Sequence, residues 1–162
     1  MKLKLIKYTS RFLLALAVAA LPFAAISAEE KKADPLMEPV KSVLDDYLKI
    51  QDELAKDSVK GVNENASAIA KAVKGDDMKM LSPDVATQAD TLAQAKDLKS
   101  ARDAFKPLSA SLVKYLADNK AGAGTYHEAY CPMVRANWLQ TGKAIKNPYM
   151  GKSMLTCGEF KN

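Results

Sequence analysis

Two pairs of sulfur-bearing side chains lie close together near the C-terminus. Cys131 and Met133 stand in the segment HEAYCPM, and Met154 and Cys157 stand in MGKSMLTCG. These cysteines are the only two in the chain, and His127, the only histidine, precedes Cys131 by four residues. Thiolate and thioether are soft ligands that favour Cu(I) or Ag(I), whereas hard cations prefer carboxylates. The residue types therefore predict a site for a soft metal ion, most simply Cu(I).

The first pair is expected on a short helix. Thr125 followed three residues later by Glu128 is a capping-box pattern, which predicts a helix over residues 126–130. On such a helix His127 and Cys131 would share one face, so that imidazole and thiolate could converge. Pro132 disfavours the helical conformation at the residue before it and so predicts an extended backbone at Cys131.

The second pair has helical spacing too. Met150, Met154 and Cys157 follow one another at intervals of four and three residues, which places them on one face of a helix or turn. Packing this turn against Cys131 would assemble a sulfur-rich pocket. A Cys131–Cys157 disulfide explains the cysteines equally well in an oxidising compartment, and methionine is a common gap-filler of cores. The residue types and spacing are compatible with both a metal site and a structural disulfide.

The N-terminus indicates export. Lys and Arg residues precede the apolar run 12–25, and the small-residue sequence Ile26-Ser27-Ala28 follows it, as in a signal peptide cleaved after residue 28. This segment holds four of the 24 basic residues and none of the 19 acidic ones, so residues 29–162 carry 20 basic against 19 acidic. A nearly neutral mature chain gives no support for nucleic-acid binding. We expect a periplasmic protein with no membrane span once the signal is removed.

Residues 29–162 are predicted to form a single all-α domain, with a helical bundle over 29–120 and a metal-binding segment over 121–162. Apolar residues recur at helical spacing in four stretches, near 36–54, 59–73, 85–93 and 98–116. Asp34 and Ser82 are candidate N-caps, and Gly75 a candidate C-cap. Pro107 predicts a kink or a helix start near Lys106.

The last quarter of the chain is expected to be irregular but folded. It contains five of the eight aromatic residues of the mature chain, and Trp138 is the natural anchor of its core. The segment carries no hydrolase motif and no glycine-rich phosphate loop, so no catalytic residue is assigned. A thiol-dependent redox enzyme is a further hypothesis. It would need a cysteine with a lowered pKa and a site for the developing charge, and the sequence shows no motif for such a site.

The segments YCPM, WL and IKNPYMGKSMLTCGE resemble a family of exported helical domains of unassigned activity, which also occurs fused to periplasmic adaptor subunits of heavy-metal efflux systems. Upstream, VLDDYLKIQDELAKD and ARDAFKPLSASLVKYL resemble that family's first and last bundle helices. The resemblance implies a helical bundle associated with copper or silver handling. It carries over Cys131, Met133, Met154 and Cys157, whereas His127 is assigned from spacing alone.

The expected function is periplasmic binding of Cu(I) or Ag(I) in heavy-metal homeostasis, resistance or delivery to efflux, with components of an efflux system as partners. The alternative is a disulfide-stapled interaction module that docks on an efflux adaptor or envelope protein without binding metal.

Overall fold

The computed structural model describes residues 36–161, and the signal segment 1–28 and the Asp34 cap lie outside them. Four helices come first: α1 (Val40–Ala55), α2 (Val62–Lys74), α3 (Pro83–Ala93) and α4 (Leu98–Asn119). A small sheet follows, made of β1 (His127–Cys131), β2 (Ala136–Gln140) and β3 (Glu159–Phe160), with the 3-10 helix η1 (Gly151–Met154) before β3. Within residues 36–161, no helix is both long and apolar enough to cross a membrane.

The bundle was predicted correctly, and so were several of its ends. Ser82 accepts a hydrogen bond from the backbone N–H of Asp84, and Pro83 occupies the first turn of α3, as expected for this cap. α4 ends at Asn119. The helix start expected near Lys106 is wrong, because α4 begins at Leu98 behind an Asp97–Ser100 capping box and continues through Pro107.

The all-α prediction is wrong: the C-terminal part adds a three-stranded antiparallel sheet in the order β2-β1-β3, which makes the fold mixed α and β. The helix expected over 126–130 is strand β1, paired with β2 through the register Cys131↔Ala136 and with β3 through Ala129↔Phe160. A one-turn helix has a high nucleation cost for few hydrogen bonds, whereas a strand here gains two partners. The extended backbone that Pro132 predicted for Cys131 is confirmed.

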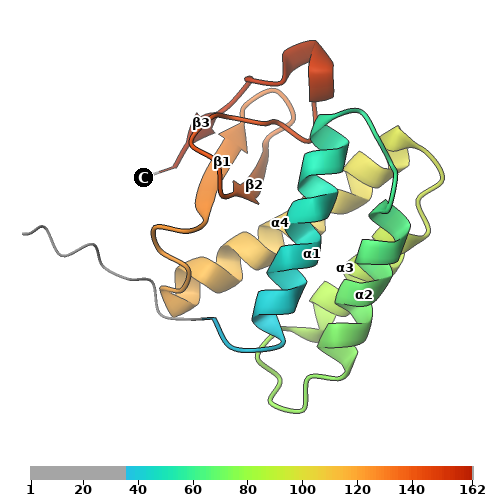
Figure 1. Cartoon of the computed structure of the whole chain (residues 1–162), viewed down its shortest axis with the longest axis vertical. Helices are drawn as coiled ribbons and strands as arrows, with labels where there is room; N and C mark the ends of the chain where they lie inside the picture. Colours follow the sequence, from blue (N-terminus) through green and yellow to red (C-terminus); the bar gives the residue numbers. More distant parts are fainter. Residues whose placement is uncertain (1–35, 162) are drawn as a thin grey trace, which may run out of the picture. The chain divides into compact units, whose positions relative to one another are not determined.

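The sheet lies on α1 and α4, on the far side of α1 from α2 and α3 (Figure 1). Tyr47 of α1 connects the two parts. Its ring is fully buried and stacks on Phe105 of α4 with centroids 4.9 Å apart. Its hydroxyl pairs with Ser109 Oγ at 2.6 Å and accepts the backbone N–H of Leu139 in β2 at 3.1 Å. The side chain of Tyr47 therefore joins the first helix, the last helix and the edge strand β2 of the sheet.

A partly exposed ion pair holds the segment that carries the second sulfur pair. Arg102 of α4 donates to Asp57 Oδ1 at 2.6 Å, to the carbonyl of Leu54 at 2.9 Å and to the carbonyl of Pro148 at 2.7 Å. Gly151 lies directly against this ion pair and has a φ of +56°. A Cβ at that position would overlap both the Asp57 carboxylate and the Arg102 guanidinium.

Gly151→Ala should therefore destabilise the fold more than Gly124→Ala. Both glycines have positive φ, but a Cβ on Gly124 meets nothing within 4 Å, so that substitution carries only the backbone strain of about 1 kcal/mol. Gly151→Ala adds a steric conflict with a fixed ion pair, which should bring the loss to about 3 kcal/mol or more. Urea denaturation of the two variants measures the difference, and equal losses would contradict this account of Gly151.

Candidate functional site

The structure brings the two cysteines together. Cys131 is at the end of β1, and Cys157 follows η1 in the turn before β3; their sulfurs lie 3.9 Å apart, and both are free thiols. Cys131 is completely buried in the main core, whereas Cys157 is only partly buried against it. Residues 26 apart in sequence thus form one dithiol pair at the boundary between core and surface.

The turn after Cys131 directs polar hydrogens at its sulfur. β1 and β2 are joined by residues 132–135, with Arg135 in the left-handed region. Burial alone would raise the pKa of the Cys131 thiol. The backbone N–H groups of Val134 and Met133, the side-chain amide of Asn147 and the Cys157 thiol oppose this effect and together hold the pKa below its usual value.

Cys157 has the opposite electrostatic environment. Burial raises the pKa of its thiol, and the hydrogen bond to Cys131 and the developing charge on that neighbour raise it further. Cys131 therefore gives up a proton more readily than Cys157 does. A metal ion would displace the protons that remain on the pair.

Asn147 is the residue that the sequence interpretation missed. It is fully buried, and its Nδ2 donates to the carbonyl of Cys157 at 2.5 Å while also acting on the Cys131 sulfur. Its Oδ1 accepts the backbone N–H groups of Tyr149 and Met150 at 2.8 and 3.1 Å. One amide thus fixes the turn after it and the backbone of Cys157, and it lowers the pKa of Cys131. The signal available in the sequence is the Asn147-Pro148 pair, which is typical of a turn or a helix start.

The two predicted methionine ligands lie in the turns that hold the cysteines. Met133 is in the hairpin turn that follows Cys131, and 62% of it is exposed. Met154 is half-buried at the end of η1, and its carbonyl accepts the backbone N–H of Cys157 at 3.0 Å. Each thioether is therefore within three residues of a thiol, in a segment that already approaches the pair.

His127 does not join this cluster. It is at the opposite end of β1 from Cys131, and four residues of strand separate their Cα atoms by about 13 Å. Its ring meets the edge of Phe160 in β3, with centroids 5.7 Å apart. The convergence of His127 with Cys131 depended on a helix, so the change from helix to strand removes it.

Trp138 has the role that its residue type predicted. It is fully buried in β2, its indole N–H donates to Gln140 Oε1 at 3.0 Å, and its ring meets Tyr149 edge-on with centroids 6.1 Å apart. Gly158, next to Cys157, passes so close that a Cβ there would lie 2.8 Å from the indole. Trp138 therefore sets how deeply the Cys157 turn enters the core.

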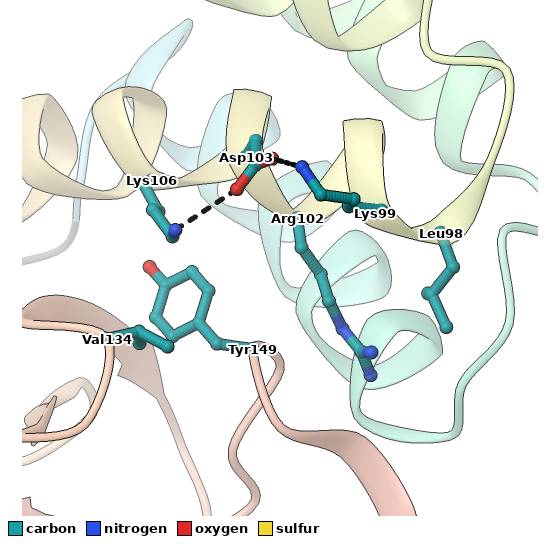
Figure 2. Close-up of a pocket in the computed structure, with 7 residues that line it drawn as sticks. All are labelled: Leu98, Lys99, Arg102, Asp103, Lys106, Val134 and Tyr149. Carbon is teal, nitrogen blue, oxygen red and sulfur yellow. Dashed lines mark hydrogen bonds and ion pairs between the residues drawn. The ribbon is translucent and has the colours of Figure 1, made fainter.

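A groove of about 400 Å³ lies beside the hairpin turn, and Figure 2 shows its lining. Val134 and Tyr149 form one wall and α4 forms the other. Asp103 binds both lysines that line the groove, Lys99 at 2.8 Å and Lys106 at 3.1 Å. This wall keeps a net positive charge, because Asp103 supplies one carboxylate to two lysines and Asp57, outside the groove, pairs with Arg102.

Within residues 36–161, no group of three or more His, Cys, Asp or Glu side chains is placed to hold a metal ion. The soft ligands in these segments are the two thiols and, two or three residues from them in sequence, the thioethers of Met133 and Met154. Such a donor set is soft and short of hard oxygen and nitrogen ligands, which matches Cu(I) or Ag(I) and does not match a tetrahedral zinc site of Cys and His.

The chain matches no curated protein and no solved structure. A family model described as "Protein of unknown function (DUF3347)" matches residues 43–124, which is half of the chain. The match runs from α1 to the loop after α4, so the helical bundle carries it and the cysteine pair follows it. The chain belongs to the DUF3347 family.

Proposed function

We propose that this protein binds a soft monovalent metal ion, Cu(I) or Ag(I), between Cys131 and Cys157. The observation that carries the proposal is the 3.9 Å approach of the two sulfurs, and the N–H groups that lower the pKa of Cys131 support it. Hydrogen bonds from a fixed backbone stabilise a thiolate before the metal arrives and orient it afterwards. Met133 and Met154 complete the ligand set as neutral donors. His127 is left out of this set because the strand holds it away from Cys131.

The proposed setting is the periplasm, where the protein would bind the ion for homeostasis, resistance or delivery to an efflux system. Support comes from the sequence of residues 1–28, which has the charge and apolar pattern of a signal peptide, and from the resemblance of the C-terminal segment to domains fused to heavy-metal efflux adaptors. The proposed partners are periplasmic components of such a system.

The proposal is for a binding protein and not an enzyme. Nucleophilic cysteines combine a lowered pKa with access to the substrate. In this pair the two properties are divided, since the thiol with the lowered pKa is the buried one, Cys131. A substrate in solution would meet Cys157, whose pKa is raised.

The second candidate function is a disulfide-stapled interaction module that docks on an efflux adaptor or envelope protein and binds no metal. The same contact between the two sulfurs favours it, because exported thiols held together are readily oxidised. A disulfide would join the β1 hairpin to the β3 turn and close a loop of the sheet. The two functions differ in the redox state of the cysteine pair: metal binding needs two thiols, whereas the interaction module has a disulfide.

Reduced protein should bind about one Cu(I), and Cys131→Ser or Cys157→Ser should each weaken binding by about a hundredfold or more, because a thiolate supplies both charge and softness. Met133→Leu or Met154→Leu should weaken it by about tenfold or less, since a thioether is a neutral donor. A competition titration with a colorimetric Cu(I) chelator measures all five proteins. Equal affinities in wild type and both serine variants would reject the thiolate site and favour the interaction module.

Oxidation should abolish metal binding, because the two sulfurs cannot be both a disulfide and thiolate ligands. Protein treated with a thiol oxidant should lose both titratable thiols and its Cu(I) binding, and a reductant should restore them. Thiol counting on protein isolated from the exported compartment without reductant then identifies the working state. Two free thiols or a bound metal support the metal site, whereas a full disulfide in that compartment supports the interaction module.

Asn147→Asp should weaken Cu(I) binding by about ten- to a hundredfold, as expected for loss of a residue that orients metal ligands. The carboxylate would face the Cys157 carbonyl and the Cys131 sulfur, replacing a donor by a negative charge at nearly the same size. Asn119→Asp is the matched control, since Asn119 also donates to a carbonyl, at the exposed end of α4. Urea denaturation separates a loss of stability from a loss of affinity, and wild-type affinity in a folded Asn147→Asp variant would contradict the assigned role.

A further inference from the structure

The two thiols differ in access to solvent. Cys131 is completely buried in strand β1, among the residues of the main core. Cys157 is partly exposed, and the exposed residues Ser153 and Thr156 lie in the same stretch of chain. Because the sulfurs are in contact, a molecule that approaches from solvent meets the Cys157 sulfur first.

The two thiols also differ in how firmly they are held. Cys131 is fixed by strand pairing on both sides of β1 and by the N–H donors of its hairpin turn. Cys157 stands in a turn closed by its backbone N–H on the Met154 carbonyl, and its sulfur has Cys131 as its partner. Asn147 binds the Cys157 carbonyl and so holds the backbone of this residue, not its sulfur.

We infer that Cys131 is the permanent anchor of the bound ion and that Cys157 is the ligand exchanged when the ion is transferred to or from a carrier that offers a thiolate or thioether. The inference rests on the proposed function. In release, the sulfur of the carrier forms a bond to Cu(I), the bond between Cu(I) and Cys157 breaks, and Cys157 takes a proton from water. The Cys131–Cu(I) bond breaks last, and loading follows the reverse order. No electron is transferred at any step.

In the metal-free protein, solvent access and thiolate character predict opposite orders of alkylation for the two cysteines. If thiolate character controlled reactivity, Cys131 would react first, because its pKa is lowered and that of Cys157 is raised. If access controls it, iodoacetamide should modify Cys157 at least about ten times faster than Cys131 in the folded, reduced protein, since Cys131 reacts only after local opening. Peptide mass spectrometry after short exposures measures both rates. In guanidinium chloride the difference should largely disappear, and faster modification of Cys131 in the folded protein would overturn the inference.

The second measurement follows Cu(I) loading from a chelator complex by stopped-flow absorbance. Cys157→Ser should slow loading at least about tenfold more than Cys131→Ser, because it removes the accessible entry ligand, whereas Cys131→Ser leaves that ligand in place. A larger slowing in Cys131→Ser would overturn the inference while the proposed metal site stands. Absence of Cu(I) binding in reduced wild type would overturn the proposed function and the exchange role with it, whatever the order of alkylation.

Discussion

The C-terminal part of the fold depends on side chains that hydrogen-bond backbone groups lying outside its helices and strands. Residues 141–158 have little regular structure, and the peptide groups of the part that is buried, within 147–151, need hydrogen-bond partners. Side chains supply them. Gln140 binds the carbonyls of Gly142 and Ala144 and the N–H of Lys146, and Gln51 of α1 binds the Lys146 carbonyl. Arg102 and Asn147 serve the next residues along the chain in the same way.

This network explains why the cysteines meet. Once Asn147 and Arg102 fix residues 147–151, the chain has only a short path to β3, and the turn along that path carries Cys157. β3 pairs with β1 next to the residue that ends it, Cys131. The contact between the sulfurs is thus a consequence of how the backbone groups are satisfied. A preformed dithiol lowers the entropic cost of binding an ion.

Sequence periodicity was sufficient to predict the bundle, because each helix places an apolar stripe on its neighbours and ends at a recognisable residue such as Ser82. The sheet was missed because its strands are two to five residues long and their pairing depends on contacts distant in sequence. The Thr125–Glu128 pattern is local, and local signals lose when tertiary partners favour another structure. Asn147 was missed for the same reason: the groups that its amide serves are identified only once residues 131, 149 and 157 are folded around it.

Most of the C-terminal sequence pattern is accounted for by packing. Tyr149 is buried and donates its hydroxyl to the Asn137 carbonyl at 2.6 Å, Gly151 has no room for a side chain, and Gly158 lies against Trp138. These residues would be needed whether or not a metal binds, so the pattern by itself is evidence about the fold. The sulfurs are different. Cys131 could fill its buried position as an apolar residue of similar size, and the exposed thioether of Met133 makes no contribution to the core. The sulfur atoms, and the N–H groups that hold the pKa of Cys131 down, are thus the features that packing leaves unexplained.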